Sequence, residues 1–292
     1  MSEGNTKSDN AKKASGKTSF KPSDFVHLHV HTHHSLLDGL QKIPALIQKV
    51  KNSGMSAVAV TDHGTLSGSI ELYKTAKNED IKPIIGMEAY VANRKHTDRD
   101  PQLDRGRYHL ILLAMNNTGH QNLMRLSSIA NIDGMYYKPR IDHDLLEKYN
   151  EGLIVLSGCI GGEVGDLLRQ DQYDQAKKVA EWYKSIFGDR YYIEIQDHGH
   201  PEHPSSWDEQ VKLNEGLTKL AEDLDIPMAL TCDSHYLNTE DREAHEILLC
   251  VQTLSTINQE NRFSLKEFDL SLADPEEIYK RWQCKTYFIK FC

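Results

Sequence analysis

The 292-residue sequence has little positive charge and few cysteines. Its 43 acidic and 34 basic residues give a net charge of −9, which argues against a protein held to nucleic acid mainly by a basic surface. A nuclease remains possible, because bound divalent cations would reverse the charge at its active site. The 5 cysteines are odd in number and irregularly spaced, so they do not indicate a disulfide framework. This composition predicts a protein of the reducing cytoplasm.

Long apolar runs are also missing. The longest ones are strand-sized and fall far short of the ~20 residues that a membrane-spanning helix needs, so no membrane contact is expected. The N-terminal residues are rich in Ser, Lys, Asn and Gly and contain no apolar segment typical of a signal peptide. We therefore expect residues 1–22 to form a disordered tail.

After this tail, short apolar runs alternate with helical patterns, which predicts an α/β fold. Strands are expected at 25–30, 57–61, 83–91, 109–115, 152–157, 191–196 and 227–232, and helices at 44–54, 67–78, 117–130, 172–187, 207–224 and 239–252. Most of these strands are apolar on both faces, as in a covered parallel sheet. No dinucleotide fingerprint or phosphate-binding loop follows any of them. A (β/α) barrel is therefore favoured over an open, doubly wound sheet.

Five histidines fall within the stretch "HLHVHTHH", residues 27–34. Successive side chains of a strand point to opposite faces, so His27, His29 and His31 would share one face. The stretch is internal and has apolar residues between its histidines, unlike a purification tag. It predicts a metal site, with a polar surface strand as the alternative.

Further side chains of the metal-binding types stand on or after the expected strands. Asp38 follows the first strand and Glu88 lies on the third, whereas other strands end at Asp62, His63, Cys159, Asp233 and His235. In a (β/α) barrel the active site is built from the C-terminal ends of several strands, so these residues can meet at one mouth. Each has an ordinary explanation as a turn or core residue, but their coincidence at several strand ends favours one shared site. His109 stands at the start of its apolar run, and the pattern alone does not place it with the others.

Imidazole, carboxylate and thiolate ligands suit Zn²⁺, Mn²⁺ and Fe²⁺. The candidates are too many for one tetrahedral ion, and sites that cleave phosphate esters often hold metals ~3.5–4 Å apart. Glu88 is the only candidate on its strand, so we expect it to bridge two metals. The pattern indicates hydrolysis of a phosphate ester by a metal-activated hydroxide, with no protein side chain identified as the catalytic acid.

Other residues receive lesser roles. His27 and Asp62 are expected to lie behind the ligands and orient them, and His198 is expected near the mouth, where it would touch substrate. The charged segment 94–108 would offer positive charge to a DNA backbone. The remaining histidines are expected to be solvated or to cap helices: His33, His34, His96, His120, His143, His200, His203 and His245.

The order His-x-His, Asp, His, Glu, His, Cys, Asp-x-His resembles that of the PHP (polymerase and histidinol phosphatase) domain. Stretches such as "FVHLHVHTHHSLLDGL", "IKPIIGMEAYVA" and "GLIVLSGCIGGEV" resemble one branch of this family, the N-terminal domain of bacterial DNA polymerase III alpha subunits. The resemblance extends over about residues 25–255. It implies a distorted (β/α)7 barrel, the PHP fold, over residues 23–258. Residues 259–292 would then begin a linker toward a polymerase module that this chain lacks.

The resemblance also implies a centre of three divalent metals, Zn²⁺ or Mn²⁺, with Fe²⁺ and Mg²⁺ as further candidates. Its ligands would be His29, His31, Asp38, His63, Glu88, His109, Cys159, Asp233 and His235. The implied activity is a 3′→5′ proofreading exonuclease in DNA replication, with the 3′ end of DNA and other replicase subunits as partners. Two alternatives stay open: a non-catalytic, metal-stabilised scaffold of the replicative polymerase, and a phosphomonoesterase similar to histidinol phosphatase.

Overall fold

The computed structural model describes residues 20–199 and 204–282. Most of the expected tail, together with His200 and His203, lies outside these ranges, so the predictions for them are not addressed by the fold. Within the described ranges, no helix is both long and apolar enough to cross a membrane.

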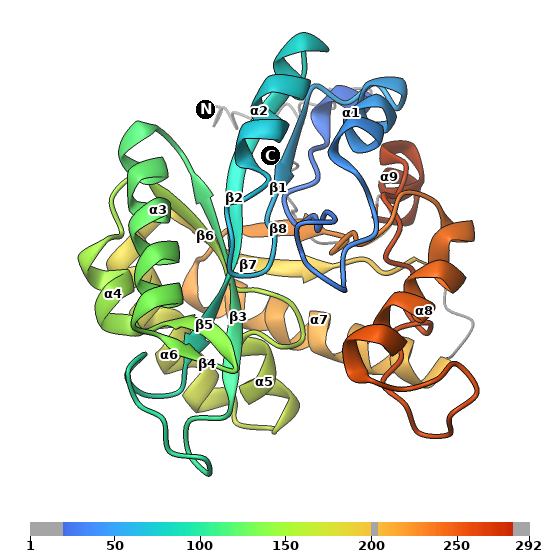
Figure 1. The fold of residues 1–292 in the computed structure, drawn as a ribbon. Helices are drawn as coiled ribbons and strands as arrows, with labels where there is room; N and C mark the ends of the chain where they lie inside the picture. Colours follow the sequence, from blue (N-terminus) through green and yellow to red (C-terminus); the bar gives the residue numbers. More distant parts are fainter. Residues whose placement is uncertain (1–19, 200–203, 283–292) are drawn as a thin grey trace, which may run out of the picture.

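The centre of the fold is a curled sheet with helices around it (Figure 1). Its strands are β1 (Ala57–Val60), β2 (Lys82–Ala92), β3 (Arg107–Ala114), β4 (Met135–Tyr136), β5 (Lys138–Ile141), β6 (Leu153–Leu156), β7 (Tyr191–Gln196) and β8 (Met228–Thr231). The order is β4-β5-β2-β3-β6-β7-β8, with β1 paired to β2. Neighbours β1 and β2, β6 and β7, and β7 and β8 are parallel. Strand β3 is antiparallel to both β2 and β6, so the expectation of a parallel sheet is wrong at this strand.

The expected first strand, residues 25–30, is not a regular strand but a segment with isolated bridges to β1 and to the residues after β8. Its backbone makes hydrogen bonds both to the end of β1 and to the residues after β8. The Thr61 amide donates to the Val30 carbonyl at 2.9 Å, and the His31 amide donates to the Ser234 carbonyl at 2.7 Å. The segment thus joins the two ends of the curled sheet, which confirms the predicted distorted barrel.

The helices cover the outside of the sheet (Figure 1). They are α1 (Ile43–Asn52), α2 (Ser69–Asn78), α3 (Asn117–Ile132), α4 (His143–Lys148), α5 (Glu163–Arg169), α6 (Tyr173–Phe187), α7 (Pro204–Leu224), α8 (Arg242–Thr253) and α9 (Pro275–Trp282). Helix α1 shows why they form: its buried residues Ile43, Leu46, Ile47 and Val50 recur at helical spacing. Burying each such side chain contributes about 1.5–3 kcal/mol. Helices α4, α5 and α9 were not predicted, because 6, 7 and 8 residues are too few for a clear period.

Residues 270–282 pack on the barrel, although they fall within the range expected to begin a linker. The Ser234 hydroxyl donates to the Ser271 carbonyl at 2.9 Å. The indole N–H of buried Trp282 donates to Asp197 Oδ2 at 2.6 Å. The domain limit at 258 stays a prediction, but the packing of the barrel includes these later residues.

Candidate metal centre

The expected ligands meet at one end of the barrel. Strands β1, β6 and β8 end there, and β2 carries Glu88 past the end of β1, where Glu88 bridges to His63. Strand β3 begins there, because it runs antiparallel to its neighbours. The direction of β3 explains the position of His109, which stands at the start of its strand and still reaches the same mouth.

Glu88 lies at the middle of this cluster and is 1% exposed. Its Oε1 is 3.0 Å from His109 Nδ1 and 3.5 Å from His29 Nε2. Its Oε2 is 3.4 Å from His31 Nε2 and 2.5 Å from His63 Nδ1. One carboxylate therefore faces four imidazoles, two on each oxygen, an arrangement suited to a bridging ligand.

Asp233 enters the cluster from the end of β8. Its Oδ1 lies 3.1 Å from His29 Nε2, 3.4 Å from His31 Nε2 and 3.6 Å from His235 Nδ1. The Asp233 backbone has a φ of 49°, in the left-handed region that asparagine and aspartate tolerate better than most residues. Such conformations persist where the surrounding structure requires them, and here the turn brings the carboxylate to the histidines.

Asp38 lies on the opposite side, on the loop after the histidine-rich segment. Its Oδ2 is 2.8 Å from His63 Nε2 and 3.8 Å from His235 Nε2, and its Oδ1 is 3.7 Å from His245 Nε2. The expectation of a solvated or capping His245 is wrong, because this side chain is 1% exposed. It lies on the buried face of α8, four residues before Leu249. That spacing is the sequence signal that was missed.

Cys159 reaches the cluster on the loop after β6. Its Sγ is 3.4 Å from His109 Nδ1 and 3.9 Å from Glu88 Oε1. The loop packs closely on β3 at Gly158, which has a φ of 86°, and a Cβ there would lie 2.4 Å from the His109 carbonyl oxygen. Only glycine fits this approach and this conformation.

The spacing of the ligand atoms suits metal ions. Three subsets each bring three such atoms within 4.8 Å of one another: His31, His63 and His235; His29, His31 and Asp233; Glu88, His109 and Cys159. Two atoms bound to one tetrahedral ion at about 2.0–2.1 Å would lie about 3.3–3.4 Å apart.

Several buried atoms of the cluster face oppositely charged neighbours without hydrogen-bond geometry. Among the described residues, His63 Nδ1, Glu88 Oε2 and Asp233 Oδ1 are buried and make no hydrogen bond. Buried polar atoms are normally satisfied. The cluster therefore fits divalent cations.

The protonation states in the cluster follow from burial and from the neighbouring charges. Burial alone would raise the pKa of Glu88, but His109 and His63 hold it well below its usual value. Burial, together with the charges of His63 and His235, lowers the pKa of His31 to about 4. An ionised carboxylate and a neutral imidazole are the forms that bind metals. Burial opposes the charged form of His63, but Glu88 and Asp38 raise its pKa to about 10, so a bound cation would replace its proton.

Two groups behind the ligands were not predicted. Glu194 Oε1 lies 2.7 Å from His29 Nδ1, and Ser35 Oγ lies 2.9 Å from His31 Nδ1. The Ser35 hydroxyl donates to Asp62 Oδ1 at 2.8 Å, so Asp62 supports His31 through Ser35. Such contacts fix the orientation of a metal-binding imidazole. The only signal for Glu194 is that it is the single acid in the apolar strand "YYIEIQ".

His27 does not join the cluster, so the expectation that it orients a ligand is wrong. Its Nε2–H donates to the Ala273 carbonyl at 3.0 Å, and its ring lies edge-on to Phe25. His198 is buried near the mouth, with its Nε2 3.1 Å from Gln196 Oε1. A contact between His198 and substrate stays a prediction.

The charged segment 94–108 contributes only in part to the mouth. Several of its charges pair with carboxylates of the segment itself or of α4. Arg107 is different, because its guanidinium lies 5.6 Å from the ring centre of Tyr90, and Lys138 Nζ lies 5.5 Å from the same ring. Tyr90 stacks beside His63 with ring centres 5.7 Å apart. Two cations thus flank the edge of the cluster.

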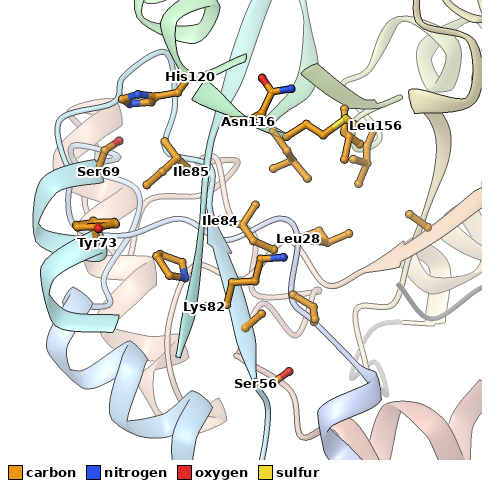
Figure 2. Close-up of a pocket in the computed structure, with 18 of the residues that line it drawn as sticks. Leu28, Ser56, Ser69, Tyr73, Lys82, Ile84, Ile85, Asn116, His120 and Leu156 are labelled. Atoms are coloured by element: carbon orange, nitrogen blue, oxygen red, sulfur yellow. The ribbon is translucent and has the colours of Figure 1, made fainter. Parts of the chain in front are cut away.

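A cavity of about 1310 Å³ lies at the other end of the barrel, near the starts of β1, β2 and β6 (Figure 2). Its walls are largely apolar and include Leu28, Ile84 and Leu156, as well as the rings of Tyr73 and His120. None of the nine expected ligands is among the described residues that line it. The cavity is therefore separate from the candidate metal centre.

Comparisons with known proteins identify the family to which the chain is similar. A family model of the PHP domain matches residues 27–198. The DNA polymerase III subunit alpha of Borreliella burgdorferi is 44% identical over 257 residues, which cover 88% of this chain and 22% of that protein. The protein of the same name from Aquifex aeolicus is 44% identical over 273 residues, 90% of this chain and 23% of that protein. The chain thus spans about a fifth of the length of these relatives.

Among solved structures, a two-domain protein from Bacteroides vulgatus is described as containing a predicted PHP-like metal-dependent phosphoesterase. It is 12% identical and aligns with a TM-score of 0.44 over 72% of this chain and 52% of that chain. This likeness is too weak to argue from.

Proposed function

Because this chain belongs to the PHP domain family, we propose that it is a metal-dependent phosphoesterase that removes nucleotides from the 3′ end of DNA. The main support is the meeting of nine ligand-type side chains, with Glu88 among them, in one cluster that contains buried polar atoms without hydrogen-bond geometry. The DNA substrate is proposed from the relatives, which are named DNA polymerase III subunit alpha. Other replicase subunits in the cytoplasm are the proposed partners.

We assign the metal ligands as the nine residues of the cluster and propose up to three divalent ions, Zn²⁺ or Mn²⁺ before Fe²⁺ or Mg²⁺. The ligands are His29, His31, Asp38, His63, Glu88, His109, Cys159, Asp233 and His235. When bound, such ions polarise phosphoryl oxygens and lower the pKa of water. His245 is proposed as a positioning residue for Asp38, because its Nε2 lies 3.7 Å from Asp38 Oδ1.

The side chains of the protein itself orient the proposed histidine ligands. Glu194 and Ser35 accept the Nδ1–H protons of His29 and His31, which leaves both Nε2 atoms directed at Glu88 and Asp233. A fixed tautomer and a fixed ring plane hold these ligands ready before any substrate arrives. At the edge of the cluster, the cations around Tyr90 would hold the phosphates that flank the bond to be cleaved.

Removing these two cations is expected to weaken substrate binding more than turnover. The double variant Arg107→Ala/Lys138→Ala should raise KM for an oligonucleotide roughly tenfold, the effect of about 1.4 kcal/mol, and reduce its salt dependence. Steady-state kinetics at several salt concentrations provide the measurement. The matched control Lys51→Ala/Lys77→Ala removes two cations from α1 and α2, outside the cluster. An unchanged KM in the first variant, with metal content intact, would contradict the role of the two cations.

The proposed activity is tested with the purified chain, Mn²⁺ or Zn²⁺, and oligonucleotides labelled at either end. A 3′→5′ exonuclease gives a ladder of shortened products from a 5′-labelled strand and early release of a 3′ label. The Asp233→Asn variant should give neither. Release of phosphate from small monoesters, with oligonucleotides left intact, would replace the proposal with a phosphomonoesterase. Retained metal without any turnover would replace it with a scaffold.

A further inference from the structure

A second group of ligand-type side chains lies outside the cluster, between the end of the histidine-rich segment and the first turn of α2. It consists of His33, His34 and Glu71, each offering one ligand atom within 4.8 Å of the other two. The two imidazoles lie side by side, with ring centres 4.3 Å apart. None of the three belongs to the nine proposed ligands, and His33 is exposed to solvent.

The ring of His34 is held in place by its surroundings. Ser67 Oγ lies 3.1 Å from its Nδ1, and Gly68 packs so closely that a Cβ there would lie 2.9 Å from the ring. With Nδ1 engaged, Nε2 faces Glu71 Oε2 at 3.4 Å. This distance is long for a hydrogen bond of a charged pair, which is usually about 2.7–2.9 Å. It equals the separation of about 3.3–3.4 Å expected for two ligands of one tetrahedral ion.

We infer that His33, His34 and Glu71 form a second, solvent-accessible site for a zinc-type transition metal ion. Two imidazoles and a carboxylate are ligands that suit Zn²⁺, and a site with three protein ligands leaves a coordination position for water. Because the site is open, its ion should exchange faster than the ions of the buried cluster. The site does not depend on the proposed hydrolysis.

An ion at this site would also restrain the loop between His31 and Asp38, which carries part of the cluster. His33 and His34 lie between His31 and Asp38, whereas Glu71 belongs to α2. An ion held by all three would fasten this loop to α2. A plain ion pair between protonated His34 and Glu71 would also join the two elements, but it would not involve His33. Dependence on His33 therefore separates the two explanations.

The test uses the full chain with Zn²⁺ alone, in equilibrium dialysis over a range of concentrations followed by elemental analysis. The variants His33→Gln and Glu71→Gln should each bind one Zn²⁺ per chain less than the unaltered chain at saturation, and both should retain the tightly held portion. The matched control His120→Gln replaces a histidine of α3 that is not one of the three proposed ligands and should bind the full amount. Melting curves recorded in parallel show that each variant is folded.

Zinc stoichiometry in His33→Gln equal to that of the unaltered chain would overturn the inference, whatever Glu71→Gln does. Hydrogen exchange gives an independent measurement. At zinc concentrations above saturation of the cluster, further Zn²⁺ should slow exchange in residues 32–38 of the unaltered chain and not in His33→Gln. Equal slowing in both would also overturn the inference.

Discussion

Replacing Glu88 by Gln is expected to lower metal-dependent hydrolysis more than a hundredfold and to reduce the bound metal. Loss of a group that only supports a ligand typically costs 10–100-fold in affinity or activity, and Glu88 itself faces four histidines on its two oxygens. Glutamine has nearly the same shape but offers one neutral oxygen, so it would not serve as the proposed bridging ligand. Initial rates on an oligonucleotide and elemental analysis of the same preparation provide the measurement.

A matched control for this variant is Glu246→Gln. Glu246 is also a buried glutamate, but it pairs with Arg262 at 2.6 Å and accepts a hydrogen bond from Ser264 at 2.7 Å, and neither partner is one of the nine proposed ligands. Its replacement should cost stability and leave the metal content unchanged. Full metal content and full activity in Glu88→Gln would remove this carboxylate from the proposed centre.

Chelation of the divalent metals is expected to lower the melting temperature by roughly 5–10 °C for each site that was held at about 100 times its dissociation constant. Metal bound only by the folded state stabilises it by mass action. Without cations, some buried polar atoms of the cluster make no hydrogen bond, among them Glu88 Oε2, Asp233 Oδ1 and His63 Nδ1. Calorimetry before dialysis against a chelator, after it, and after addition of Mn²⁺ or Zn²⁺ gives the shift and its reversal.

The double variant His29→Gln/His31→Gln serves as the comparison for this experiment. It should melt at a lower temperature than the metal-loaded chain and respond much less to the chelator, because two proposed ligands that contact both Glu88 and Asp233 are gone. An equal response to the chelator in both proteins would show that the stabilising metal lies elsewhere in the chain.

Much of this site was predictable from the sequence because ligand-type residues recur at strand ends, and the strands, though not their directions, follow from apolar runs. His109 shows the limit. Hydropathy places a residue along its strand but does not tell which way the strand runs, so the antiparallel β3 could not be foreseen. His27 shows a second limit. Side chains alternate between two faces only in a regular strand, and the segment that carries His27 pairs with its neighbours at isolated bridges.

The supporting residues were harder to predict, because their partners are distant in sequence. Glu194 contacts His29 across 165 positions, and a lone glutamate in an apolar strand gives no indication of that partner. His245 and Asp38 are similarly joined only by the fold. The helical spacing of α8 does indicate that His245 is buried, because it stands four residues before the buried Leu249.

The left-handed backbone at Asp233 also limits how this position can change over evolutionary time. Glycine and asparagine adopt such a conformation at little cost, whereas β-branched residues do so only with strain. A lineage that dispensed with metal chemistry would therefore be expected to drift at this position toward the two residues that keep the turn. The barrel would then persist after its reactivity had gone.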